Sequence, residues 1–292
     1  MLTDDRWRHR RTPLLLVTLI AVLGTILGGQ ERDMFSESDA YERFMGRWSR
    51  ALAPRLVRFA GVRDGERLLD VGVGTGALTE AIAAAAPRGT VVGIDPSEGY
   101  VAFARKSHPD ERLRFEVGDA RDMRFEDAAF DRTLSLLVVN FIPDPGRAVS
   151  EMRRVTRTGG TVVAAVWDYG EGMQMLREFW DTVISLWPDA DARDERHMPL
   201  SRAGELAMLW REAGLLDVSE QALAVPTRFL SFEDYWSPFL GGQGPAGAFV
   251  SGLSSEDRER LRTALRRRLL GEGPERSIAL EARAWAVRGT VP

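Results

Sequence analysis

The chain has 292 residues, which is enough for one large domain or two small ones. Its hydrophobic content of 44% and charged content of 28% are those of an ordinary globular protein. The formal net charge of −4 gives no general attraction to nucleic acid, so no nucleic-acid partner is expected. Because the chain has no cysteine, disulfides, thiolate nucleophiles and cysteine-based metal sites are excluded, and we expect no metal site.

The first 33 residues differ in composition from the rest of the chain. A cluster of arginines between Arg6 and Arg11 precedes an apolar run over residues 14–27. This run is shorter than the ~20 residues that a membrane-spanning helix needs, and no A-x-A cleavage pattern follows it. We interpret residues 1–33 as an N-terminal extension, either an artefact of an upstream start or a weak membrane-associating tail. Residues 34–292 then form a cytoplasmic domain, with membrane association only through residues 14–27.

A helix is predicted over residues 38–60. An apolar stripe recurs at four-residue spacing and consists of Phe44, Trp48, Leu52 and Leu56. The simplest role of this helix is to pack on a sheet. The alternative is a lid over a ligand, in which Tyr41 and Arg47 reach inward as cofactor-binding residues.

The next segment is a strand, a glycine-rich turn and a helix. The strand ends in Asp70 and is followed by Gly72, Gly74 and Gly76, after which a helical pattern begins. Glycine permits positive φ and the close approach of a ligand, and the free N–H groups at a helix start face the same place. The spacing also satisfies a loose dinucleotide fingerprint, and a tight turn without any ligand is a further alternative.

Strands and helices then alternate along the chain. Strands are expected over residues 90–95, 113–119, 130–139 and 161–167, and helices over residues 98–107 and 144–155. Such alternation predicts a doubly wound α/β fold, with a parallel sheet and helices on both faces. Ligands of these sheets bind beyond the carboxyl ends of the strands.

Two carboxylates follow strands of this sheet. Asp95 ends the second strand, where it can accept hydrogen bonds from the ribose hydroxyls of an adenosine. The alternative for Asp95 is a helix N-cap, since Pro96 follows it. Asp119 follows Gly118 at the end of the third strand, where its carboxylate can accept a hydrogen bond from an adenine amino group and the Ala120 N–H can reach a ring nitrogen.

With these residues in this order, the stretch over residues 68–167 resembles a class I methyltransferase that depends on S-adenosylmethionine (SAM). It is most similar to the small-molecule group that includes the ubiquinone and menaquinone methyltransferases. The resemblance implies SAM as cofactor and a Rossmann-like sheet of seven strands, mostly parallel, whose last strand over residues 278–287 runs antiparallel. It further implies a SAM-binding core over about residues 62–167 and cap insertions over about residues 168–200 and 230–272.

The resemblance also assigns roles to single residues. Asp70 and the three glycines are expected around the methionine part of SAM, and Leu136 is expected beside its sulfonium. Asn140 stands where relatives often have a histidine, so no histidine chemistry is expected at this position.

The part of the chain after residue 168 is interpreted mainly from its apolar pattern. A helix over residues 201–213 is predicted to begin at a capping Ser201 and to end at Gly214. A strand is expected over residues 218–229 and a basic helix over residues 254–270. The aromatic residues between positions 167 and 239 either fill the core of a cap or line an acceptor pocket, and the expected liners are Trp167, Tyr169 and Trp236.

The proposed reaction needs few catalytic groups, because the methyl group of SAM is already activated by the positive sulfur. The catalytic residue is unknown, and the candidates for a general base are Asp168, Tyr169 and His197. His108 is interpreted as a solvated side chain. We expect methyl transfer to a small, apolar or aromatic acceptor, without predicting the acceptor atom or the oligomeric state. The alternatives are a nicotinamide-dependent oxidoreductase and a non-catalytic SAM-binding protein.

Overall fold

The computed structural model describes residues 42–292. The expectations for residues 1–33 and for Tyr41 therefore lie outside the described residues. Within the described part, no helix is both long and apolar enough to cross a membrane.

The core of the molecule is one seven-stranded sheet, as the resemblance implied. The strands are β1 (Arg67–Val71), β2 (Thr90–Asp95), β3 (Leu113–Val117), β4 (Phe130–Leu136), β5 (Thr156–Trp167), β6 (Leu216–Phe229) and β7 (Ile278–Thr290). Their order across the sheet is β3-β2-β1-β4-β5-β7-β6, and β7 runs antiparallel to both of its neighbours. The first five strands are parallel, so their carboxyl ends meet at the same edge.

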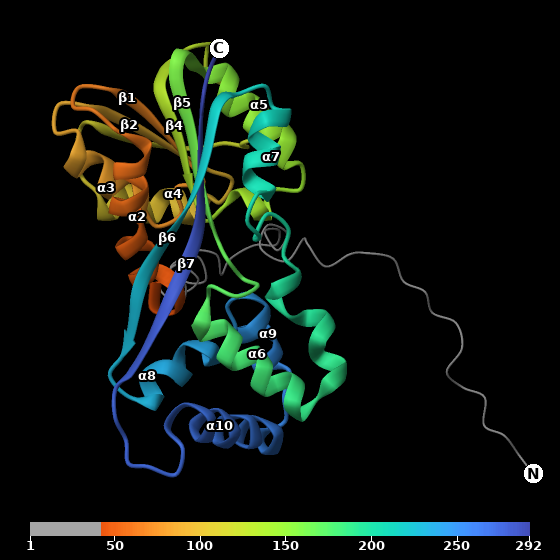
Figure 1. Ribbon diagram of the computed structural model, residues 1–292. Coiled ribbons are helices and arrows are strands. Elements are labelled where there is room, and N and C mark those ends of the chain that lie inside the picture. Colours follow the sequence, from red (N-terminus) through yellow and green to blue (C-terminus); the bar gives the residue numbers. More distant parts are fainter. Residues whose placement is uncertain (1–41) are drawn as a thin grey trace, which may run out of the picture.

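Helices cover both faces of the sheet. The helices of this layer are α2 (Arg47–Ala60), α3 (Ala77–Ala85), α4 (Glu98–Ser107), α5 (Pro145–Val155) and α7 (Glu205–Glu212). Figure 1 shows α2 and α3 on one face and α5 and α7 on the other. The buried side of α2 carries Trp48, Leu52 and Leu56, which is the stripe expected from the sequence.

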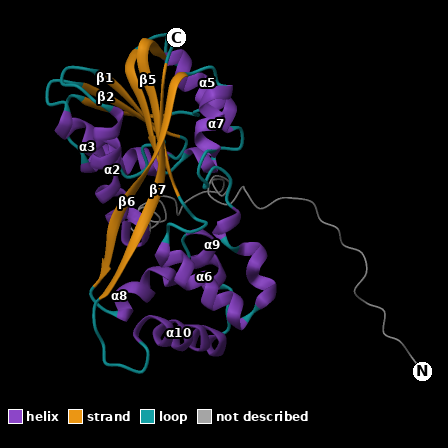
Figure 2. Ribbon diagram, viewed as in Figure 1, coloured by secondary structure: helices purple, strands orange, loops and turns teal. Residues whose placement is uncertain are grey.

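A second group of helices forms a cap below the sheet (Figure 2). Its helices are α6 (Gln174–Leu186), α8 (Phe232–Trp236), α9 (Gly244–Ser251) and α10 (Ser255–Leu270), joined by short turns of 3-10 helix over residues 188–193, 195–197 and 237–241. The long strands β6 and β7 run from the sheet into this cap, and the chain leaves the carboxyl end of β5 to enter α6 (Figure 1). The carboxyl edge of the parallel strands therefore faces the cap.

Aromatic rings fill the interior of the cap. Phe179 of α6 stacks on Phe239 with 4.5 Å between ring centroids, and Trp180 lies against Phe249. The hydroxyl of Tyr235 is buried and donates to the backbone oxygen of Met175. Of the two interpretations of the aromatic segment, the structure shows these rings in the role of a cap core.

Several element ends differ from the sequence prediction. Strand β4 ends at Leu136 rather than at residue 139, because Leu137 has a φ of +63° and turns the chain away from the sheet. Helix α7 begins at Glu205 rather than at residue 201. Ser201 does not cap it, because its hydroxyl donates to the Met198 carbonyl, and Gly204 precedes the helix with a φ of +86°.

Candidate functional site

The glycine turn after β1 is open on one side and tightly packed on the other. Gly72, Gly74 and Gly76 have φ values of +79°, +51° and +92°, which L side chains rarely adopt. A Cβ at Gly72 would lie 2.5 Å from side-chain atoms of Val138, whereas a Cβ at Gly74 would meet no described atom within 4 Å. The turn therefore leaves space for a ligand at Gly74.

Asp95 joins the end of β2 to this turn. The Gly74 N–H donates to one carboxylate oxygen of Asp95 at 3.0 Å, and the Ser97 N–H donates to the other at 2.9 Å. Burial raises the pKa of Asp95. The N-cap of α4 is Ser97, whose hydroxyl accepts from the Tyr100 N–H, so the alternative N-cap role of Asp95 is wrong. Each oxygen of Asp95 still has acceptor capacity for one further hydrogen bond.

Asp70 is buried directly before the turn. One of its carboxylate oxygens accepts from the hydroxyl of Thr79 at 2.7 Å, and the other has no hydrogen-bond partner. Burial raises the pKa of Asp70 to about 7, and the negative charge of Asp95 adds to this effect. Because buried polar atoms are almost always paired, an unpaired carboxylate oxygen beside an open turn indicates a place where a ligand donates.

Asp119 follows β3 at the same edge of the sheet. The Gly118 N–H donates to the backbone oxygen of Asp95 at 3.1 Å, which places the two strand ends side by side. The guanidinium of Arg121 donates to both carboxylate oxygens of Asp119 and lowers the pKa of that carboxyl. Ala120, the next residue, is partly buried and packs against the main core.

The chain after β4 brings a further polar group to this region. Leu136 ends β4 at 8% exposure, and the strained Leu137 follows it. Asn140 is 6% exposed, and neither its amide nitrogen nor its amide oxygen has a partner. Asn140 stood out in the sequence only because relatives often have a histidine there. Its position directly after the predicted end of a strand is the signal that could have pointed to it as a candidate site residue.

Other predicted site residues have contacts elsewhere. Arg47 donates to the carboxylate of Asp234 on α8, and its guanidinium lies 4.4 Å from the ring centroid of Trp48. Asp168 is buried and accepts from the guanidinium of Arg283 at 2.9 Å, while its other oxygen accepts from the Glu171 N–H. These contacts fix the turn after β5, and they hold both oxygens of Asp168.

The remaining candidate site residues differ in how exposed their side chains are. Tyr169 is 7% exposed. The side chain of His197 is 50% exposed in the cap, where its Nε2 lies 3.4 Å from Asp191. Pro96 is exposed between Asp95 and α4.

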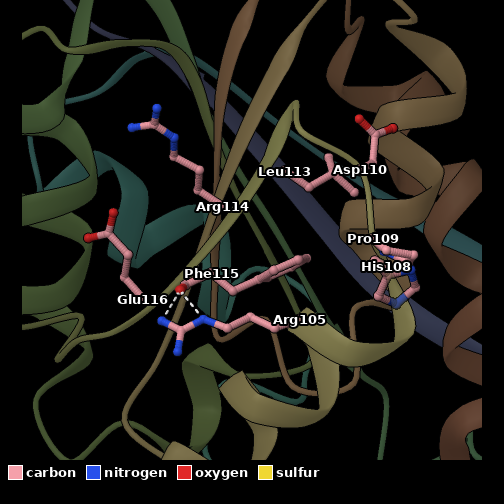
Figure 3. Close-up of a pocket in the computed structure, with 8 residues that line it drawn as sticks. All are labelled: Arg105, His108, Pro109, Asp110, Leu113, Arg114, Phe115 and Glu116. Atoms are coloured by element: carbon pink, nitrogen blue, oxygen red, sulfur yellow. Dashed lines mark hydrogen bonds between the residues drawn. The ribbon is translucent and has the colours of Figure 1, made fainter.

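A separate cavity of about 430 Å³ lies against the outer side of β3 (Figure 3). Its lining includes neither Asp95 nor Asp119. His108 lines it, and the His108 ring also contacts the backbone of the glycine turn, with Nε2 3.1 Å from the Thr75 oxygen. The interpretation of His108 as a solvated side chain is therefore wrong, because the ring packs against a turn 33 residues earlier in the chain.

The polar groups at the glycine turn suit a ligand with an adenosine and an amino-acid part. Asp95 and Asp119 end neighbouring strands and present acceptors for hydroxyl and amino groups. The unpaired oxygen of Asp70 can accept from an ammonium group, and the first N–H groups of α3 have no acceptor within the helix. The residues present therefore fit SAM.

Comparisons with known proteins agree with this geometry. Residues 69–164 match the family described as methyltransferase domain. A phosphatidylethanolamine N-methyltransferase of Cereibacter sphaeroides is 37% identical over 129 residues, which cover 42% of this chain and 61% of that protein. A demethylmenaquinone methyltransferase of Staphylococcus aureus (strain JH9) is 39% identical over 111 residues, covering 37% of this chain and 46% of that one. The matched stretch thus spans about half the length of these relatives.

Solved structures show the same fold. The phosphoethanolamine N-methyltransferase 2 of Haemonchus contortus in complex with SAM aligns with a TM-score of 0.54 at 20% identity, covering 92% of this chain and 61% of that one. The YcgJ protein of Bacillus subtilis aligns with a TM-score of 0.54 at 21% identity, covering 84% of this chain and 99% of that one. Residues 69–164 are therefore similar to a methyltransferase domain, and the chain has the fold of a solved structure that is named as a methyltransferase in complex with SAM.

Proposed function

We propose that this chain transfers the methyl group of SAM to a small-molecule acceptor held between the carboxyl edge of the sheet and the cap. The observation that carries the proposal is the unpaired oxygen of Asp70 beside the open side of Gly74, in a turn that Asp95 holds from the neighbouring strand. All of these groups lie within residues 69–164, the stretch that matches the methyltransferase domain.

Residues at the ends of neighbouring strands bind the adenosine part of the cofactor. Asp95 binds the ribose hydroxyls, and Asp119 with the Ala120 N–H binds the adenine. We assign Pro96 to the rim of the cofactor site, because it is exposed and directly follows Asp95. The pairing of Asp119 with Arg121 keeps its carboxyl ionised and therefore an acceptor.

The methionine part of the cofactor lies against the glycine turn. Gly74 provides the open space, and the unpaired oxygen of Asp70 accepts from the ammonium group. Leu136 lies beside the sulfonium, at the end of β4. Bound SAM supplies a methyl group that positive sulfur has already activated. The chain supplies position and a dry site, and such positioning contributes ~7–11 kcal/mol to a transfer reaction.

We propose an acceptor with an apolar or aromatic body and one polar group. Asn140 supports this, because its buried amide offers a donor nitrogen and an acceptor oxygen that no described residue uses. Leaving both unpaired costs free energy that a bound polar group would recover. The matched relatives are named for demethylmenaquinone and for phosphatidylethanolamine, which both combine apolar chains with a polar methyl-accepting part. Trp167 and Trp236 are buried and can contribute only the edge of such a pocket.

Calorimetry with S-adenosylhomocysteine (SAH), the demethylated cofactor, tests the cofactor assignment. We expect the unchanged chain to bind SAH and the Asp95→Asn variant to bind it at least about tenfold more weakly, because hydrogen bonds to a charged acceptor are lost. The matched control is Asp127→Asn, since Asp127 is 79% exposed and pairs with Arg154 away from the turn. Binding of NADH without binding of SAH would instead support an oxidoreductase.

Methyl transfer itself requires an acceptor screen. We expect label from methyl-labelled SAM to reach at least one member of a panel of hydroquinones, phenols and amine-bearing lipids. SAH binding without transfer to any member would favour a SAM-binding protein without catalytic activity.

A further inference from the structure

His108 contacts the glycine turn at Thr75 and Gly76. It follows the last residue of α4, and its Nε2 lies 3.1 Å from the backbone oxygen of Thr75. A carbonyl oxygen can only accept, so Nε2 carries a proton and donates. A Cβ at Gly76 would lie 2.4 Å from the same Nε2, so the ring comes this close only because residue 76 is glycine.

The contact fixes one peptide group at both of its ends. The N–H of Gly76 donates to the Val73 oxygen at 2.8 Å, while the oxygen of the same peptide, on Thr75, accepts from His108. This peptide directly precedes Ala77, the first residue of α3. Its orientation therefore sets the direction of the first N–H groups of α3, which are the donors left free for an anionic ligand group.

The ring is held by a separate packing unit. Figure 3 shows the Phe115 ring extending toward His108, and the two ring centroids are 6.2 Å apart. The guanidinium of Arg105 on α4 donates to the Phe115 oxygen and joins α4 to β3. Val73 of the turn inserts its side chain into the same unit, in a cluster with Val101, Ala104 and Phe115. The α4–β3 unit thus holds the turn through Val73 and through His108.

We propose that His108 is a positioning residue for the cofactor, which keeps the Thr75–Gly76 peptide in the orientation that binds SAM. This inference rests on the proposed function, because it concerns the same cofactor site. His108 lines the cavity against β3, and it acts through the backbone of Thr75 rather than by touching the cofactor.

The test compares His108→Gln with His108→Met. Glutamine keeps a donor near the position of Nε2, and methionine has a similar length without a donor. We expect the Kd for SAH, measured by calorimetry, to rise about 3- to 10-fold in H108M and to stay within about twofold of the unchanged chain in H108Q, since one hydrogen bond separates them. The surface control is Met208→Gln on α7, a residue that is 56% exposed, for which we expect no change.

Thermal unfolding of both variants separates positioning from stability. We expect H108Q and H108M to unfold within a few degrees of each other, so that a difference in Kd reports on the turn. Equal SAH binding by H108M and the unchanged chain would overturn the proposal. Failure of the unchanged chain to bind SAH would instead overturn the proposed function, so the two failures are distinguishable.

Nitrogen NMR of the imidazoles gives an independent readout. The chain has three histidines, and replacing His9 and His197 by Gln leaves the His108 signals alone. We expect the tautomer that is protonated at Nε2, and a shift of its signals when SAH is added. A neutral ring protonated only at Nδ1 would contradict the contact with Thr75 and with it the proposal.

Discussion

One carboxylate oxygen of Asp70 is buried without a hydrogen-bond partner. The cost of this arrangement is visible in the pKa, which burial raises to about 7, with a further contribution from the charge of Asp95. In the unfolded chain the carboxyl titrates near its ordinary pKa of about 3.9. Between these two pKa values the carboxyl is protonated in the folded state and ionised in the unfolded state. The free energy of unfolding therefore falls as the pH rises through this range, and it stays lowered above it.

Replacing Asp70 by Asn removes this titration, so the difference in stability between D70N and the unchanged chain should depend on pH. Each unit of pKa difference between folded and unfolded states is worth about 1.4 kcal/mol. We expect the free energy of unfolding of D70N, relative to the unchanged chain, to rise by up to about 4 kcal/mol between pH 4 and pH 7 and to level off above pH 7. Urea denaturation at a series of pH values measures this difference.

The matched control for D70N is Asp127→Asn, because Asp127 is 79% exposed. Its stability relative to the unchanged chain should change little over the same pH range. A D70N difference that is flat with pH would show that Asp70 is not held with a raised pKa in the folded state.

Sequence reasoning located some of these residues and not others. Asp70, Asp95 and Asp119 could be predicted, because each ends a strand or follows one closely, and parallel strand ends meet at the same edge. The contact of His108 with Thr75 could not, since it joins residues 33 positions apart across two elements. Nor did the pattern show that Asp168 would pair with Arg283, 115 positions later.

At the scale of elements, the apolar pattern predicted the presence of most helices and strands, but it predicted their first and last residues less well. Strand β2 and helix α4 were predicted with the bounds that the structure has. The end of β4 was not, because the apolar run continues through residue 139 while the backbone turns at Leu137. A positive φ at a leucine has no sequence signal, so the end of β4 could not be predicted from the apolar run.

Helix α6 is the element whose packing holds the cap together. Phe179 is fully buried, stacks on Phe239 and lies edge-on to Trp180. We expect Phe179→Ala to lower the free energy of unfolding by about 3–5 kcal/mol, which is the usual cost of removing a buried phenylalanine ring. Urea denaturation followed by tryptophan fluorescence measures this loss.

The control for F179A is Leu230→Ala, a large apolar side chain that is 85% exposed. Its removal should change the free energy of unfolding by less than about 0.5 kcal/mol. A loss below about 1 kcal/mol for F179A would mean that the rings of the cap repack around the missing side chain.

At the scale of the whole molecule, the sheet and the cap are one structure joined in several places. Strands β6 and β7 extend from the sheet into the cap (Figure 1). In addition, Arg47 of α2 in the sheet layer pairs with Asp234 of α8. The seven strands and the antiparallel direction of the last one could be predicted from the resemblance to a family. The arrangement of the cap could not, because its two insertions are separated in the chain by α7 and β6 and meet only in the folded protein.

The pair of Arg47 and Asp234 can be tested as a link between the sheet layer and the cap. The guanidinium donates to both carboxylate oxygens at 3.1 and 3.2 Å, and the side chains are 34% and 30% exposed. For a partly exposed pair we expect a coupling of about 0.5–1 kcal/mol in a double-mutant cycle of Arg47→Met and Asp234→Asn. Additive losses would show that the ion pair contributes nothing.

The same two variants decide whether Arg47 also reaches the cofactor, as the lid interpretation predicts. Both variants break the ion pair, but only R47M removes the guanidinium. The guanidinium lies over the rings of Trp48 and Phe229, with 4.4 and 4.8 Å to their centroids, so its described contacts are with α2, β6 and α8. We therefore expect R47M and D234N to bind SAH with equal affinity in calorimetry. Weaker binding by R47M alone would show that the guanidinium contacts the cofactor directly, because loss of the ion pair is common to both variants.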